Sequence, residues 1–278
     1  MSDRQRPTYV VGDVHGHRDQ LADALRAAGL LDDDDRWAGG NARVWFLGDF
    51  VDRGPDGIGV IDLVMSLADQ AGEAGGAVDS VLGNHEILML GMYTFGDTAV
   101  PSDFGIRSFA RSWLLNGGRI RDIQGLTDRH LEWLTSRPVI AHAADHLLMH
   151  SDTTAYLEWG DDANSINKAV RDILAGDDLV EWWDVWSRMT TRYAFRGPDG
   201  PEVAGLLLER LGGQRIVHGH SVIADQMGVA PEDVTGPLLY AGGKVLGIDG
   251  GVFVGGPMLV VSLPYQEPGG DAEPRDAE

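Results

Sequence analysis

Five short apolar segments of this 278-residue chain each run directly into a residue that can bind a metal ion or carry a proton. They are residues 9–11, 44–47, 81–82, 147–149 and 216–217. Uninterrupted runs rich in Val, Leu and Ile are typical of strands that are buried on both faces. Strands of this kind favour an α/β fold, in which chemistry gathers at the carboxyl ends of neighbouring strands.

The residues that follow these segments form a consistent set of candidate metal ligands. They are Asp13, His15, Asp49, Asn84, His150 and His220. If the strands are neighbours, their ends bring these six side chains into one pocket. Carboxylate, amide and imidazole groups suit divalent first-row metals. The chain contains no cysteine, which excludes a thiolate site and a disulfide framework.

Helical spacing of apolar residues predicts helices over 18–30 and 57–70, each placed between two predicted strands. Two successive β–α–β crossovers predict a parallel central sheet. After residue 216 the chain is rich in glycine turns, and three segments there indicate strands of a second sheet. These segments are 245–249, 252–254 and 258–263.

Between the third and fourth predicted strands lies a helical insertion over about 87–146, which we interpret as a cap. Three segments within it have helical patterns, namely 87–92, 108–115 and 128–134. We predict a single domain over 8–264 that includes this cap. The remaining residues, 265–278, are rich in Pro, Gly and acidic side chains, and we expect them to be disordered.

The formal charge of −21 disfavours nucleic-acid polymers and anionic lipid surfaces as partners. No stretch of 18 apolar residues is present, so no membrane span is expected. The first seven residues are polar and lack the apolar region of a signal peptide. These features, with the absence of cysteine, favour a cytoplasmic location.

The first two ligand loops have the chemistry of a two-metal site. Asp13 and His15 alternate along an extended segment and can point to the same side. The carboxylate of Asp49 has two oxygens and can bridge two cations. Two cations about 3.5–4 Å apart can clamp both ends of an in-line displacement at phosphorus, and a bridging water between them is deprotonated near neutral pH.

Each candidate alone has an ordinary structural explanation, since an Asp after a strand is usually a cap or turn former. Three Gly-bounded loops of this composition in one chain are improbable by chance. The loops read Gly12-Asp13-Val14-His15-Gly16, Gly48-Asp49-Phe50-Val51-Asp52-Arg53-Gly54 and Gly83-Asn84-His85-Glu86. Together they resemble the signature loops of the calcineurin-like metallophosphoesterases.

The resemblance is to the phosphoprotein phosphatase branch, in its bacterial, lambda-phosphatase-like type, and it extends from about residue 9 to 263. Four further phrases contribute to it: Trp113-Leu114-Leu115-Asn116-Gly117-Gly118, His150-Ser151-Asp152, Trp186-Ser187-Arg188 and Ile248-Asp249-Gly250-Gly251-Val252. It implies the α/β fold of that family (α+β in some schemes), a four-layer β-sandwich flanked by helices.

The resemblance also implies a role for each residue. Asp13 and His15 would bind the first metal, Asp49 would bridge, and Asn84, His150 and His220 would bind the second. His85 would be the general acid, oriented by Asp52, while Arg53 and Arg188 would hold the phosphoryl oxygens. A planar guanidinium matches two phosphate oxygens, which agrees with this role. Two divalent ions are expected, with Mn²⁺ first and Fe or Zn²⁺ as alternatives.

Several points stay open at this level. Either His218 or His220 could be the last ligand, and His220 fits the motif better. Arg188 competes with Arg192 and Arg196 for the phosphate. The implied activity is a serine/threonine protein phosphatase that uses a metal-bridging hydroxide, with a phosphorylated protein or a small phosphoester as partner. Hydrolysis of diadenosine tetraphosphate or another nucleotide is the main alternative, and a non-catalytic phosphate-binding protein is a third.

Overall fold

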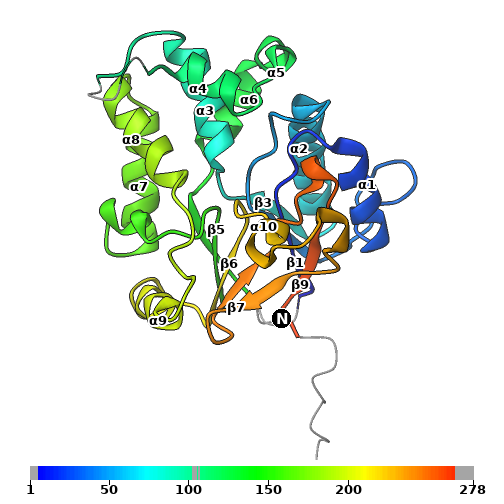
Figure 1. Cartoon of the computed structure of the whole chain (residues 1–278). Helices are drawn as coiled ribbons and strands as arrows, with labels where there is room; N and C mark the ends of the chain where they lie inside the picture. Colours follow the sequence, from blue (N-terminus) through cyan, green and yellow to red (C-terminus); the bar gives the residue numbers. More distant parts are fainter. Residues whose placement is uncertain (1–5, 102–104, 106, 267–278) are drawn as a thin grey trace, which may run out of the picture.

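Two β-sheets stacked face to face form the centre of the molecule, and helices cover their outer sides (Figure 1). This computed structural model describes residues 6–101, 105 and 107–266. The predicted tail therefore lies almost wholly outside the described residues. No helix within the described ranges is long and apolar enough to cross a bilayer.

The first sheet has the order β3-β2-β1-β9. Its strands are β1 (Thr8–Val11), β2 (Arg43–Phe46), β3 (Ala77–Ser80) and β9 (Val260–Leu263). The pairs β1–β2 and β2–β3 are parallel, as the two predicted crossovers require. Strand β9 pairs antiparallel with β1, so the segment predicted for the second sheet instead covers the open edge of the first.

The second sheet has the order β4-β5-β6-β8-β7. Its strands are β4 (Ile140–Ala143), β5 (His146–Met149), β6 (Arg215–His218), β7 (Leu238–Tyr240) and β8 (Val245–Gly247). Strands β5, β6 and β8 are parallel neighbours, whereas β4 and β7 are antiparallel edges. Strand β4 was not predicted and lies inside the range 87–146 assigned to the cap.

One predicted strand is wrong. Residues 252–254 form a single 3-10 turn, η4 (Val252–Val254). Gly251 and Gly255 at its two ends both have positive φ, which turns the chain and prevents an extended segment.

Helices α1 (Arg18–Ala27) and α2 (Gly57–Glu73) cover the outer side of the first sheet. Helices α7 (Ala163–Leu174) and α9 (Gly200–Leu211) cover the second. Short elements complete the chain: η2 (Ala155–Glu158), α10 (Ile223–Met227) and η3 (Pro231–Asp233).

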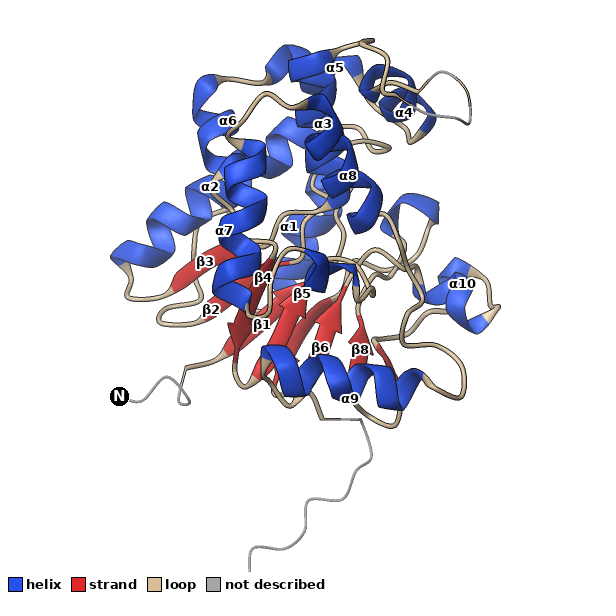
Figure 2. Ribbon diagram, turned by 90° about the vertical axis from the view of Figure 1, so that its left-hand side faces the viewer, coloured by secondary structure: helices blue, strands red, loops and turns tan. Residues whose placement is uncertain are grey.

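Five helices gather above the strands (Figure 2). They are α3 (Asn84–Phe95), α4 (Phe109–Leu115), α5 (Ile120–Gly125), α6 (Asp128–Thr135) and α8 (Leu179–Met189). The sequence predicted helical segments at α3, α4 and α6 but missed the six-residue α5.

The strands alternate between two cores, which explains why their sequences are apolar without interruption. Val10, Leu148 and Val217 belong to the core between the two sheets. Their neighbours Val11 and Leu147 belong to the larger core beneath the helices. Period-two geometry sends successive side chains to opposite faces, and both faces are covered here. Burial of each such side chain contributes about 1.5–3 kcal/mol.

Candidate metal centre

The carboxyl ends of β2 and β5 lie beside each other, although they belong to different sheets. His150 follows β5, and its Nδ1–H donates to the carbonyl of Leu47 after β2 at 2.7 Å. A second contact joins the ends of β1 and β6, because both carboxylate oxygens of Asp13 accept the backbone N–H of His220 at 3.0 Å. The five predicted strands therefore deliver their terminal residues to one place through two facing sheets.

Asp49 lies at the centre of this place. Its Oδ2 is 3.5 Å from Nε2 of His15, and its Oδ1 is 3.4 Å from Nε2 of His150. Two groups of three side chains have ligand atoms within 4.8 Å of one another, and Asp49 belongs to both. The groups are His15, Asp49 and His85, and Asp49, His150 and His220. One carboxylate is thus placed between two clusters.

The predicted second-metal ligands come together. Nε2 of His150 lies 2.8 Å from Oδ1 of Asn84. The rings of His150 and His220 are 5.0 Å apart between centroids. Backbone carbonyls orient both imidazoles, since Nδ1 of His150 and Nε2 of His220 contact the carbonyls of Leu47 and Thr190. Such bonds fix the ring orientation of a metal-binding histidine.

The predicted first-metal pair is arranged differently from expectation. His15 donates from Nδ1 to the carbonyl of Val51 at 3.0 Å, which leaves Nε2 facing Asp49. Asp13 is buried beside these residues, but its carboxylate is bound to the N–H of His220. His85 therefore takes part in the first three-residue group, and Asp13 does not.

Backbone strain is concentrated in these loops. Ten non-glycine residues in the described ranges have positive φ, and five of them are site residues. These are His15, Asp49, Asp52, Arg53 and His220. Left-handed conformations cost energy for side chains with a Cβ and persist only where the surroundings enforce them.

Two glycines allow the loops to approach so closely. A Cβ at Gly83 would lie 2.3 Å from Oδ1 of Asp49, and a Cβ at Gly219 would lie 2.0 Å from Oδ1 of Asp13. Any side chain at these positions would displace a carboxylate.

The start of helix α3 holds three predicted residues in place. Glu86 is fully buried, and its carboxylate accepts the backbone N–H groups of Asp49 at 2.7 Å, Phe50 at 2.7 Å and Gly83 at 3.0 Å. The N–H of His85 in turn donates to Oδ1 of Asp49 at 3.0 Å. The helix N-terminus therefore binds the central carboxylate directly. The sequence motif contained Glu86, but no role was predicted for it.

His85 and Asp52 form a buried pair. Nδ1 of His85 donates to Oδ2 of Asp52 at 2.7 Å, and Oδ1 of Asp52 accepts the indole N–H of Trp113 at 2.7 Å. Nε2 of His85 lies 3.2 Å from Nη2 of Arg53, whose guanidinium stacks 4.0 Å above the ring centroid of Phe253. Trp113 begins the motif 113–118 that contributes to the family resemblance, but its bond to Asp52 was not predicted.

Burial and neighbouring charges set the ionisation of the site. Burial disfavours a charged imidazole and lowers the pKa of His15, His150 and His220, which keeps them in the neutral form that binds metals. Burial would raise the pKa of Asp49, but the surrounding imidazoles of His150, His85 and His15 favour its ionised form and lower that pKa.

His85 behaves differently from the other histidines. Burial acts to lower its pKa, but the negative charges of Asp49 and Asp52 raise it above the ordinary value. Burial together with the charges of Asp249 and Asp49 raises the pKa of Asp13 well above its usual range. Neutral imidazoles around crowded, solvent-excluded carboxylates form a donor set that fits divalent cations, because cations relieve the carboxylate repulsion.

The three candidate phosphate-binding arginines separate in the structure. Arg188 on α8 pairs with Asp184 at 2.6 Å and with Glu158 at 3.7 Å, so its guanidinium is engaged by two acidic side chains outside the clusters. The charge of Arg192 instead lowers the pKa of His150 and His220, which places its guanidinium near the second cluster.

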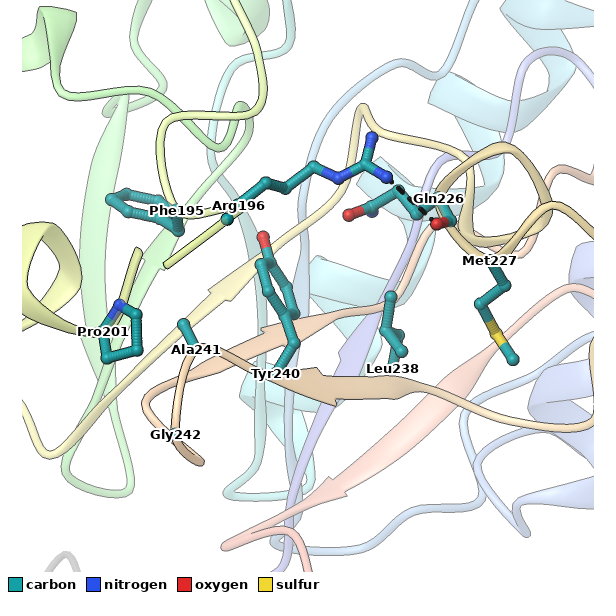
Figure 3. A pocket seen from close by; sticks show the side chains of 10 residues that line it. Phe195, Arg196, Pro201, Gln226, Met227, Leu238, Tyr240, Ala241 and Gly242 are labelled. Atoms are coloured by element: carbon teal, nitrogen blue, oxygen red, sulfur yellow. Dashed lines mark hydrogen bonds between the residues drawn. The ribbon is translucent and has the colours of Figure 1, made fainter. Parts of the chain in front are cut away.

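Arg196 lines a separate cavity of about 440 Å³ beside β7, together with Tyr240, the partner of His218 (Figure 3). Nη2 of Arg196 donates to the carbonyl of Gln226 at 3.0 Å across this cavity. Nε2 of His218 accepts the hydroxyl of Tyr240 at 2.8 Å, and Nδ1 contacts the carbonyl of Gly219. Both ring nitrogens of His218 are thus bonded away from the clusters, in contrast to His220.

Comparisons with known proteins agree with this geometry. A family model described as calcineurin-like phosphoesterase matches residues 6–224. Shewanella-like protein phosphatase 2 of Arabidopsis thaliana is 31% identical over 115 residues, which is 41% of this chain and 28% of that protein. The symmetrical bis(5'-nucleosyl)-tetraphosphatase of Bordetella pertussis is 28% identical over 147 residues, 53% of this chain and 44% of the other. The chain thus spans less than half the length of both relatives.

Similar solved structures support the fold alone. A cold-active protein tyrosine phosphatase has a TM-score of 0.71 at 22% identity, covering 93% of this chain and 73% of that one. A protein serine/threonine phosphatase from Saccharomyces cerevisiae has a TM-score of 0.53 at 16% identity, covering 89% and 72%. Both share the arrangement of two mixed sheets between helices.

Proposed function

We propose that this chain, which belongs to the calcineurin-like phosphoesterase family, removes phosphate from phosphoserine and phosphothreonine residues of proteins. Membership of this family makes it a metal-dependent phosphoesterase. The observation that carries the two-metal part of the proposal is the position of Asp49, between Nε2 of His15 and Nε2 of His150. A carboxylate with an imidazole beside each oxygen supports a bridging role for Asp49.

The ligand assignment proposed here is the one that the sequence predicts. Asp13 and His15 would hold one ion, Asn84, His150 and His220 would hold the other, and Asp49 would contact both. The clusters around Asp49 support this assignment for His15, His150 and His220, and the contact of Asn84 with His150 supports it for Asn84, whereas Asp13 is included on the sequence motif alone. Two bound cations supply charge neutralisation at the phosphoryl group and lower the pKa of the attacking water. Nitrogen and oxygen donors suit Mn²⁺, which we propose as the working metal, and also Fe and Zn²⁺.

His85 is proposed as the general acid that protonates the departing alcohol oxygen. Its Nδ1–H is held by Asp52 at 2.7 Å. Nε2, which accepts a bond from Nη2 of Arg53 at 3.2 Å in this structure, is therefore the atom that would carry the transferred proton once Arg53 turns to the phosphoryl oxygens. The raised pKa of His85 keeps a proton available near neutral pH. Trp113 donates to the second oxygen of Asp52, which prevents this buried carboxylate from rotating away.

Arg53 is proposed to bind the phosphoryl oxygens, because its guanidinium lies next to the proton-carrying atom of His85. The N–H of Arg53 donates to the carbonyl of Gly117 at 2.8 Å, and this bond positions its backbone. For the second guanidinium we favour Arg192 over Arg188. Arg192 acts on the charges of the cluster, whereas Arg188 is already engaged by Asp184 and Glu158. Contact of Arg188 with phosphate stays a sequence-based prediction.

Hydrolysis of dinucleoside tetraphosphates is the second candidate, because one group of relatives carries that name. A non-catalytic phosphate-binding protein is a weaker third candidate, since the buried His and Asp clusters and His85 are all present. A metal-reconstituted substrate panel separates the three. We expect higher kcat/KM on phosphopeptides than on diadenosine tetraphosphate, and the reverse order would overturn the proposed substrate class.

The bridge is tested with Asp49→Ala. We expect this variant to lose turnover of a chromogenic aryl phosphate and to bind fewer than two metal ions per chain. Asp69→Ala is the matched control, because Asp69 is an exposed carboxylate on α2 that forms an exposed ion pair with Arg129 at 3.5 Å. Normal turnover by correctly folded Asp49→Ala would refute the shared carboxylate.

A further inference from the structure

A cavity of about 300 Å³ lies between helices α4 and α8, next to the proposed catalytic centre. Its lining includes Arg107, Arg111, Trp183, Trp186, Ser187 and Thr190. Helix α3, which carries Asn84 and His85 at its start, packs against both α4 and α8. Figure 1 shows α4 directly above α3, and α8 to the left of both, in the upper part of the molecule.

Thr190 joins this cavity to the metal centre. Its hydroxyl accepts the side-chain N–H of Asn84 at 3.2 Å, and its carbonyl contacts Nε2 of His220 at 3.1 Å. A wall residue of the cavity therefore touches two proposed ligands of the second metal. A substrate whose phosphate is at the centre could reach the cavity with a neighbouring group.

The cavity is basic in a protein that is strongly acidic. The chain carries a formal charge of −21, yet the described residues of the lining include two arginines and no acidic side chain. Arg111 is exposed on α4, and its guanidinium has no recorded acidic partner among the described residues. Overall charge repels anionic ligands, so a local cationic site selects which of them can approach.

The other wall of the cavity is aromatic. The rings of Trp183 and Trp186 are 4.6 Å apart, and Trp183 also contacts the ring of Phe109 at 5.2 Å. Trp182 nearby donates its indole N–H to the carbonyl of Gly176 at 3.1 Å. The indole nitrogen of Trp186 is buried and has no hydrogen-bond partner in the described part of the chain. A ligand with an acceptor group would relieve that deficiency.

Beyond the cavity, an apolar strip leads toward Arg53. Leu115 lines the cavity and is 78% exposed, and Leu114 and Ile120 are 59% and 61% exposed. Gly117, between these residues, accepts the backbone N–H of Arg53. An extended apolar surface from a cationic cavity to a phosphate-binding arginine matches a peptide chain better than a compact small molecule.

We propose that this cavity is a specificity subsite that binds an acidic side chain close to the phosphorylated residue of a peptide substrate. The inference rests on the proposed protein phosphatase function and narrows it to acidic phosphopeptides. Arg111 supplies the opposite charge, and the exposed strip 114–120 supports the peptide.

The test compares two phosphoserine peptides that differ only in having Glu or Gln at the flanking positions. Exposed ion pairs are individually weak, so we expect kcat/KM of the wild type to be about three- to tenfold higher for the Glu peptide. Arg111→Gln should bring this ratio close to one, mainly through KM. Arg111→Glu should reverse the preference toward a Lys-flanked peptide, a result that a purely structural role would not produce.

Arg129→Gln is the matched control, because Arg129 is an exposed arginine on α6 that pairs with Asp69. It should leave the ratio as in the wild type. If the wild type hydrolyses the Glu and Gln peptides with equal kcat/KM, the proposed subsite is wrong, whereas the protein phosphatase proposal still stands. If the wild type hydrolyses diadenosine tetraphosphate but neither peptide, and Arg111→Gln weakens that activity, the cavity binds nucleotides and both proposals are wrong.

Discussion

Replacement of His85 by Asn distinguishes between two possible roles of this residue, as a proton donor and as a metal ligand. His85 lies in the first cluster with His15 and Asp49, so its position alone allows either role. Its Nδ1 is bound to Asp52 at 2.7 Å, and the side-chain nitrogen of Asn can take over this bond. No atom of Asn takes the place of Nε2. The variant should therefore keep the fold and the orientation of Asp52 while it loses the proton carrier.

The size of the effect depends on the leaving group. General acid catalysis is worth about 10²–10⁴ in rate, which corresponds to about 3–5 kcal/mol in the activation barrier. We expect a loss of this size on a phosphoserine peptide, whose alkoxide is a poor leaving group. With 4-nitrophenyl phosphate the departing phenolate needs little protonation, so the loss should be about tenfold or less.

Two measurements check this reasoning. Steady-state kcat on both substrates gives the ratio of the two losses, and metal analysis of the purified variant gives the ions bound per chain. We expect an unchanged metal content and a loss at least tenfold larger on the peptide. Equal losses on both substrates, or the loss of an ion in His85→Asn, would show that His85 is a ligand.

Two further predictions concern stability. Glu86→Gln should lower the free energy of unfolding by about 1.5–3 kcal/mol. Both carboxylate oxygens of Glu86 accept backbone N–H groups, so the NH₂ group of Gln would face a backbone N–H donor in either orientation of the amide. An unchanged midpoint of urea unfolding would contradict this. Asp122→Asn tests the pH dependence of the free energy of unfolding, because burial raises the pKa of Asp122 from 3.8 to about 6. A raised pKa stabilises the fold at low pH, and this contribution is lost as the pH rises through about 6. Wild-type stability relative to the variant should therefore fall by about 3 kcal/mol between about pH 4 and 7, and a pH-independent difference in urea titrations would refute it.

The sequence alone determined the chemistry of the site because local patterns report it directly. Apolar runs buried on both faces predicted the strands, and the residues after them were the candidate ligands. His150 and His220 are more than 60 residues apart, yet both followed from the same local rule. The family resemblance came from three loops whose glycines are required by close contacts, as at Gly12 and Gly83.

Tertiary structure alone decided which groups meet. The expectation of neighbouring strands was correct within each sheet, but the ligands come from two sheets stacked face to face. Strand β9 closes the first sheet although it is far along the chain, because an open edge needs a partner. Local patterns contain no information on such pairings.

The residues that orient the candidate ligands could not be predicted from the sequence, for the same reason. Glu86 holds loops from two other strands, Trp113 fixes Asp52 from the cap, and the charge of Arg192 acts on the pKa of His220. Each of these interactions joins positions far apart in the sequence or depends on the direction in which a helix projects its side chains. Residue type and spacing therefore predicted which His and Asp side chains gather at the two clusters, whereas only the packed fold determines what orients them and which cavities lie beside them.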